Sequence, residues 1–181
     1  MILCEKIVNT KDYAGRLDII TGVENFETNV TYNEEFHTYE LNGEILPSVT
    51  QLLDDSSFEF VDPKVLKYAC DKGTLVHKEI QDFLEHQKIG FTSEFDEFLR
   101  IYAENKEKFQ EKAIFDVKTY SQNSPAKREK CYFQIKMYDD GFNFLTGDRA
   151  DNYYEIWLPH NKKGKLIDLK KEFEKGDKNE W

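Results

Sequence analysis

The chain has few cysteines and no long apolar run. Its 181 residues include only Cys4, Cys70 and Cys131, which are scattered and never spaced as C-x-x-C. This spacing argues against a disulfide framework, a zinc site or an iron-sulfur cluster. No apolar segment approaches the ~20 residues of a membrane span, and the first twelve residues gain charge too early for a secretory signal. We therefore expect a cytoplasmic protein with reduced thiols and no membrane partner.

Positive charge is also in short supply. The 25 basic residues face 35 acidic ones, a net charge of −10, which argues against non-specific coating of nucleic acid because acidic surface repels phosphate. The same balance permits an acidic site that binds a cation. With 39% hydrophobic and 14% aromatic residues, the chain can bury a sizeable core. We expect a single domain over residues 1–169 and a charged tail over 170–181.

The pattern of elements predicts a mixed α/β or α+β fold, in which helices flank a central mixed sheet. Asn42-Gly43 predicts a tight hairpin turn between two short strands. A second hairpin is expected over residues 2–20. We expect helices from Ser48, from Pro63 to a stop at Gly73, from Gly73 to Gln87, over 93–112 and from Cys131. Strands are expected over 113–120, 152–158 and 165–169.

The segment "AIFDVKTY" carries the most informative charges. Asp116 and Lys118 are two residues apart, so they share one face of a strand that is otherwise apolar. They can form a simple ion pair. Alternatively, Asp116 binds a divalent cation while Lys118 stabilises charge that develops on a phosphate.

Further candidates lie elsewhere in the chain. Asp18 sits in the apolar strand "RLDII", where an unpaired carboxylate is costly. His77 lies one turn into a helix, and Gln134 and Tyr138 share a helix face four residues apart. Each also has a purely structural interpretation. Asp18 can hydrogen-bond to a turn, and His77 can be a helix histidine with its hydrogen bonds satisfied. Gln134 and Tyr138 can belong to the packed face of an amphipathic helix.

Together the stretches "GTLVH", "GRLD", "DVK" and "QIKMY" resemble the signature of PD-(D/E)XK nucleases of the RecB type. The segment "FHTYELNGEILPSVTQLL" is similar to phage exonuclease-like members and mitochondrial genome-maintenance exonucleases. The resemblance implies a restriction-endonuclease-like fold, a bacterial or phage origin, and a site that binds Mg²⁺ or Mn²⁺. It implies that His77, Asp18 and Asp116 are metal ligands, that Lys118 is the catalytic lysine, and that Gln134 and Tyr138 support the site and its DNA.

One feature departs from the family pattern. "YAGRLDII" precedes "GTLVH" here, whereas the family places this hairpin after the histidine helix. The hairpin over 1–20 is therefore relocated, and residues 21–29 form its connection, which can span up to roughly 30 Å when extended. We predict that residues 2–8 and 16–20 join the sheet of 113–120, within one molecule or exchanged between two copies in a domain-swapped homo-oligomer.

We therefore predict a metal-dependent deoxyribonuclease, and the resemblance implies an exonuclease that acts on DNA ends or single strands. The alternative is a non-catalytic module of the same fold that binds a protein or DNA partner. Convergence of His77, Asp18, Asp116 and Lys118 would favour the enzyme. Positive charge is concentrated in two short segments. This charge either belongs to solvated loops or guides a DNA backbone toward the site. The residues are Lys127, Arg128, Lys130, Lys162, Lys163 and Lys165.

Overall fold

The computed structural model describes residues 2–4, 30–33, 38–53 and 62–174. Asp18, most of the expected N-terminal hairpin, its connection over 21–29 and the end of the tail over 175–181 lie outside the described residues. Within the described part the protein is mixed α+β, as expected, with one four-stranded and one three-stranded sheet.

The larger sheet has the strand order β1-β5-β6-β7. Its strands are β1 (Ile2–Cys4), β5 (Ala113–Lys118), β6 (Asn152–Trp157) and β7 (Lys165–Asp168). The central strands β5 and β6 run parallel, whereas β1 and β7 pair antiparallel to them at the two edges. Residues 2–4 therefore join the sheet of the predicted catalytic strand, as expected of the N-terminal segment.

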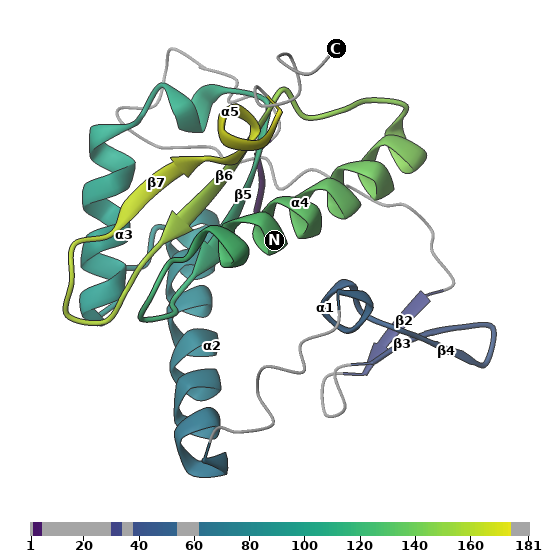
Figure 1. The fold of residues 1–181 in the computed structure, drawn as a ribbon, viewed down its shortest axis with the longest axis horizontal. Coiled ribbons are helices and arrows are strands. Elements are labelled where there is room, and N and C mark those ends of the chain that lie inside the picture. The colour runs from purple at the N-terminus through teal and green to yellow at the C-terminus, as the bar shows by residue number, and fades with distance from the viewer. Residues whose placement is uncertain (1, 5–29, 34–37, 54–61, 175–181) are drawn as a thin grey trace.

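Helices cover both faces of this sheet (Figure 1). The helices α2 (Pro63–His86) and α3 (Ser93–Glu104), followed by the 3-10 turn η2 (Lys108–Gln110), pack against one face. The helices α4 (Pro125–Thr146) and α5 (Leu169–Phe173) pack against the other. Alternation along β5 explains this division, because Phe115 and Val117 enter the α2–α3 core while Ile114 enters the α4 core.

The smaller sheet is antiparallel and has the order β2-β3-β4. It contains β2 (Val30–Asn33), β3 (Thr38–Leu41) and β4 (Glu44–Leu46), and the short helix α1 (Val49–Leu52) follows. Asn42 and Gly43 link β3 to β4 with φ values of 54° and 89°. Two consecutive positive φ angles are what a type I′ turn requires, so the predicted hairpin is confirmed.

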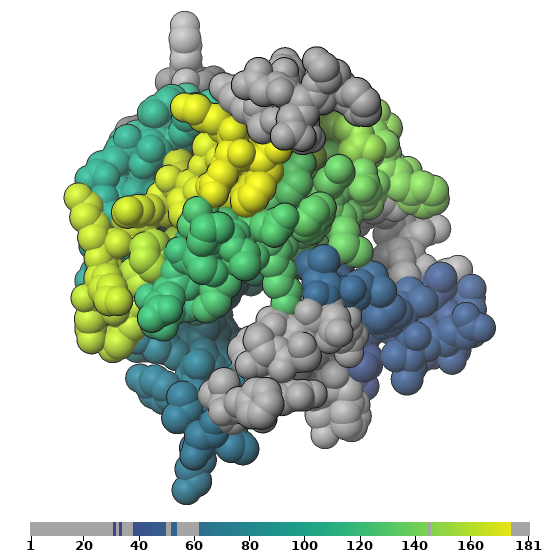
Figure 2. Space-filling model, viewed as in Figure 1, coloured from purple at the N-terminus to yellow at the C-terminus, as the bar shows by residue number. Residues whose placement is uncertain are grey.

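The prediction that Gly73 ends a helix is wrong. α2 continues through it to His86, and Gln87 ends the helix with φ 56°, its N–H bonded to the carbonyls of Asp82 and Phe83. Gly73 has a packing role instead, because a Cβ at this position would lie 3.2 Å from Oγ1 of Thr119. The absent side chain lets the helix backbone pass close to the segment that follows β5. Figure 2 shows the N-terminal half of α2 projecting from the body of the molecule.

Other boundaries also differ from those predicted, and α3 ends at Glu104 instead of extending to residue 112. α4 begins at Pro125 rather than Cys131, because Ser124 caps it by accepting a hydrogen bond from the N–H of Lys127 and Pro125 occupies the first position. The basic residues Lys127, Arg128 and Lys130 therefore lie on the first turns of a helix and not in a loop. The start of the charged tail is also ordered, since α5 extends to Phe173.

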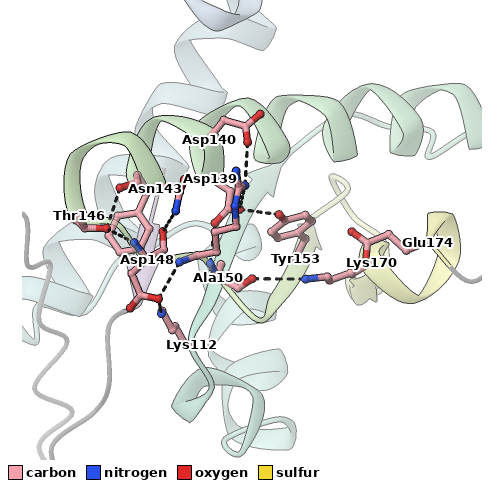
Figure 3. Close-up of polar contacts among 12 residues, drawn as sticks. Lys112, Asp139, Asp140, Asn143, Thr146, Asp148, Ala150, Tyr153, Lys170 and Glu174 are labelled. Carbon is pink, nitrogen blue, oxygen red and sulfur yellow. Dashed lines mark hydrogen bonds and ion pairs between the residues drawn. The ribbon is translucent and has the colours of Figure 1, made fainter.

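The turn from α4 into β6 is fixed by one buried carboxylate (Figure 3). Asp139 has no exposed surface and accepts hydrogen bonds from the N–H of Ala150, the hydroxyl of Tyr153 and the guanidinium of Arg149, at 2.7, 2.9 and 2.9 Å. Burial and this carboxylate raise the pKa of Tyr153. β6 is thereby held in position beside β5. Among the described residues, no helix combines the length and the apolar character needed to cross a membrane.

Candidate functional site

The charged pair of β5 lies beneath α4. Asp116 is 6% exposed, and its Oδ2 lies 2.9 Å from Nζ of Lys118. The two residues share the α4 face of the strand, as the alternation of "DVK" predicts. The ion pair, one of the two alternatives predicted for this segment, is therefore present.

Lys118 is the centre of a short polar chain. Its Nζ also donates to Oε1 of Gln134 at 2.8 Å, and Nε2 of Gln134 donates to the hydroxyl of Tyr138 at 3.0 Å. Burial lowers the pKa of Lys118, but the nearby Asp116 outweighs it, so the pKa is raised and the side chain stays an ammonium at neutral pH. The spacing of four on α4 brings Gln134 and Tyr138 together as predicted.

His77 reaches the same strand from α2. His77 is classed as exposed by its accessible surface. The protein atoms around the ring nevertheless desolvate it, and this lowers the pKa of His77. Asp116 and the backbone of Val117 act to raise that pKa and only partly offset the desolvation. A neutral imidazole can coordinate a metal through a ring nitrogen. Direct contacts thus join Asp116, Lys118, Gln134 and Tyr138 in one neighbourhood. His77 interacts electrostatically with Asp116 and Lys118 from α2, and Asp18 lies outside the described residues.

Two buried groups that the sequence reasoning did not assign to the site adjoin this neighbourhood. The thiol of Cys131, on α4, lies 3.4 Å from Oδ2 of Asp116. Glu155 is the direct partner of Asp116 in the ladder between β5 and β6, and it is 0% exposed. The sequence does indicate Glu155, because it is a single carboxylate within the apolar strand "NYYEIWL", as Asp18 is within "RLDII".

Glu155 has one oxygen with partners and one without. Its Oε1 accepts from the hydroxyl of Tyr120 at 2.7 Å and from Nδ2 of Asn123 at 2.5 Å. No described residue makes a hydrogen bond to Oε2. Burial raises the pKa of Glu155 despite the two donors. Through Tyr120 and Asn123, this carboxyl group holds the segment that follows Lys118.

The donor set for a cation is incomplete within the described part of the chain. The carboxylate of Asp116 is a ligand type that Mg²⁺ and Mn²⁺ bind, and the imidazole of His77 could add a nitrogen ligand. Among residues 2–4, 30–33, 38–53 and 62–174, no three His, Cys, Asp or Glu side chains gather closely enough to hold a metal ion. The third predicted ligand, Asp18, is not among these residues.

Comparisons with protein families, curated proteins and solved structures give no match to this chain.

Proposed function

We propose that the protein is a metal-dependent deoxyribonuclease of restriction-endonuclease-like architecture, which hydrolyses phosphodiester bonds at DNA ends or in single strands. The observation that carries the proposal is the position of the Lys118 ammonium, which is bonded both to Asp116 and to Gln134 and interacts electrostatically with His77. A buried ammonium needs hydrogen-bond acceptors in any case, so the proposal rests on the combination of the carboxylate, the amide and the imidazole around this ammonium.

The residues present would divide the chemistry between them. Asp116 and His77 would hold a divalent cation, which supplies Lewis-acid stabilisation to the phosphodiester and to the attacking water. Lys118 donates to the phosphate oxygen on which negative charge develops, and the interaction is strong because the site is largely buried. Gln134 holds the ammonium in place, and Tyr138 orients the amide of Gln134.

Cleavage of end-labelled single- and double-stranded DNA in Mg²⁺, Mn²⁺ or EDTA tests the proposal. We expect cleavage that requires the metal and that falls at least about 100-fold in Lys118→Ala, the typical loss on removing one such donor. Lys112→Ala is the matched control. Lys112 directly precedes β5, is ion-paired with Asp148 and is 28% exposed against 23% for Lys118.

Three results would contradict the nuclease proposal. They are cleavage by Lys118→Ala at the parental rate, cleavage that persists in EDTA, and equal losses in Lys118→Ala and Lys112→Ala. Binding of DNA without any cleavage would favour the non-catalytic module. Thermal unfolding in Mn²⁺ gives a readout besides activity, because a cation that binds the folded chain raises the melting temperature. Asp116→Ala should abolish that increase and Lys118→Ala should keep it.

A further inference from the structure

A second cluster of charged side chains lies outside the site described above. It joins Lys72 of α2, Glu94 of α3 and His160 of the connection between β6 and β7. Oε1 of Glu94 lies 2.6 Å from Nζ of Lys72 and 2.9 Å from Nδ1 of His160, and Nζ of Lys72 also contacts Nδ1 of His160. Three segments that are distant in sequence meet at one carboxylate.

Glu94 is the buried member of this cluster. Only 2% of its side chain is exposed. Burial alone would raise its pKa, but hydrogen bonds, above all the one from the ammonium of Lys72, lower the pKa of Glu94 to about 2. Glu94 is therefore a carboxylate at neutral pH, and it holds Lys72 and His160 side by side.

Lys72 and His160 keep donor capacity that faces away from Glu94. An ammonium has three protons, and Lys72 uses two in the contacts above. Nδ1 of His160 lies against the ammonium of Lys72 and can accept a proton of that ammonium, which places the ring proton on Nε2. Nε2–H is then a donor on the far side of the ring. The side chains of Lys72 and His160 are 19% and 52% exposed, so an anion can reach both.

The cluster lies beside the chain that leaves the candidate site. Lys72 precedes Gly73, whose backbone passes close to Thr119. His160 follows Leu158 by two residues, and the N–H of Leu158 donates to the carbonyl of Lys118 at 2.8 Å. Both donors are thus within two residues of a contact with positions 118–119.

We propose that Lys72 and His160 form a subsite for a backbone phosphate of the DNA, next to the phosphate that is cleaved at Lys118. This inference rests on the proposed function, since it identifies how the same site would hold its substrate. Two observations favour a phosphate. The donors lie near the backbone of positions 118–119, and the exposed Lys162 and Lys163 of the same connection add positive charge to a chain whose net charge is −10. Charge-assisted donors of this kind bind phosphate oxygens well.

The test measures binding of a fluorescein-labelled oligonucleotide by anisotropy, in Ca²⁺ and in EDTA, over a range of salt concentrations. Lys72→Gln retains a donor to Glu94 and removes the charge. We expect it to weaken binding about 5- to 10-fold and to reduce the slope of log K against log salt by about 0.7 to 1, the effect of losing one phosphate contact. His160→Ala, a change in an exposed connection, should weaken binding about threefold.

Lys106→Gln is the control, because Lys106 is exposed and precedes β5 at the opposite end from Lys118. It should keep the parental salt slope. Hydrolysis of bis(4-nitrophenyl) phosphate, which has a single phosphate, should be unchanged in Lys72→Gln, while KM for DNA rises and kcat is retained.

The outcomes separate the two proposals. Loss of affinity and slope in Lys72→Gln without any DNA cleavage by the parent supports the subsite and overturns the nuclease. Lys118-dependent cleavage with parental affinity and slope in both Lys72→Gln and His160→Ala overturns the subsite, and the cluster is then a structural ion-pair network. Absence of DNA binding by the parent also overturns the subsite.

Discussion

Asp116 and Glu155 are directly paired residues on the parallel strands β5 and β6, and both are buried, with 6% and 0% exposed. Two carboxylates on one face of neighbouring strands repel when both are ionised. The structure gives them different partners. Asp116 has the Lys118 ammonium, whereas Glu155 has the neutral donors Tyr120 and Asn123.

This difference predicts a pH-dependent contribution of Glu155 to stability. Burial raises the pKa of Glu155 above its value in the unfolded chain, so between these two values the folded state binds the proton that the unfolded state has lost. Stability from this group is present below the unfolded pKa and decreases as pH rises above it. Glu155→Gln cannot titrate, so it should not lose this contribution as the pH rises. Its free energy of unfolding minus that of the parent should therefore increase from pH 5 to pH 8. Urea unfolding at the two pH values measures this.

Glu129→Gln is the control for that experiment, since the side chain of Glu129 is exposed. It should show the same difference from the parent at both pH values. If Glu155→Gln follows Glu129→Gln, Glu155 is ionised in the folded protein and the electrostatic account of the pair is wrong.

The hydrogen bonds that link Lys118, Gln134 and Tyr138 predict graded effects on cleavage. Gln134 donates to Tyr138 and accepts from Lys118, so Gln134→Leu removes one of the two partners of the ammonium. We expect a loss of about 10- to 100-fold in kcat, as for groups that orient a catalytic residue. Tyr138→Phe leaves the contact of Lys118 with Gln134 in place and should cost about threefold or less. A larger loss in Tyr138→Phe than in Gln134→Leu would give Tyr138 a direct role. Steady-state kinetics on labelled DNA measure both.

Local signals in the sequence were sufficient for the strand that carries the site. The charges of "DVK" were predicted to share one face from alternation alone, and Asp116 and Lys118 do so at 2.9 Å. Asn42-Gly43 fixed the β3–β4 hairpin in the same way, because the positive φ angles of its turn depend on residues that are adjacent in sequence. Spacing of four placed Gln134 beside Tyr138.

Contacts between distant segments could not be predicted in this way. Glu94 meets His160 across 66 positions, and no periodicity in either segment indicates it. Gly73 was predicted to end a helix because glycine often does, but the nearby Thr119 gives it a packing role that only the folded chain shows. The position of Asp18 relative to Asp116 depends on the same kind of long-range contact and stays a prediction.

The buried Asp139 predicts a large and specific loss of stability (Figure 3). Asp139→Ala leaves the N–H of Ala150 and the hydroxyl of Tyr153 without the acceptor that each has in the parent. Unpaired buried donors cost about 1–3 kcal/mol each, so we expect the free energy of unfolding to fall by about 2–6 kcal/mol. Asp140→Ala is the control, because Asp140 is 56% exposed and its contact is an ion pair with Arg149. Chemical denaturation that gives equal losses for the two variants would contradict the role of Asp139.

The last prediction compares two glycines for which opposite effects of alanine are expected. A Cβ at Gly90 would lie 2.8 Å from Cδ of Glu79 and 2.8 Å from Cγ of Phe95. Neither neighbour can move freely. The carboxylate of Glu79 accepts hydrogen bonds from Thr92 and from the N–H of Phe91, and Phe95 is 0% exposed in the core. Gly90→Ala should therefore lower the free energy of unfolding by about 1–3 kcal/mol, the usual cost of overpacking.

A Cβ at Gly141 of α4, by contrast, would meet nothing within 4 Å. Gly141→Ala should raise the free energy of unfolding by about 0.5–1 kcal/mol, because alanine is the better residue within a helix. A change of 1 kcal/mol shifts the melting temperature of a chain of this size by about 2–4 °C, so calorimetry can resolve both effects. If Gly90→Ala melts at or above the parent, the loop between α2 and α3 can move away from Glu79. The hydrogen bonds from Phe91 and Thr92 to Glu79 would then not fix the start of α3, where Glu94 contacts Lys72 and His160.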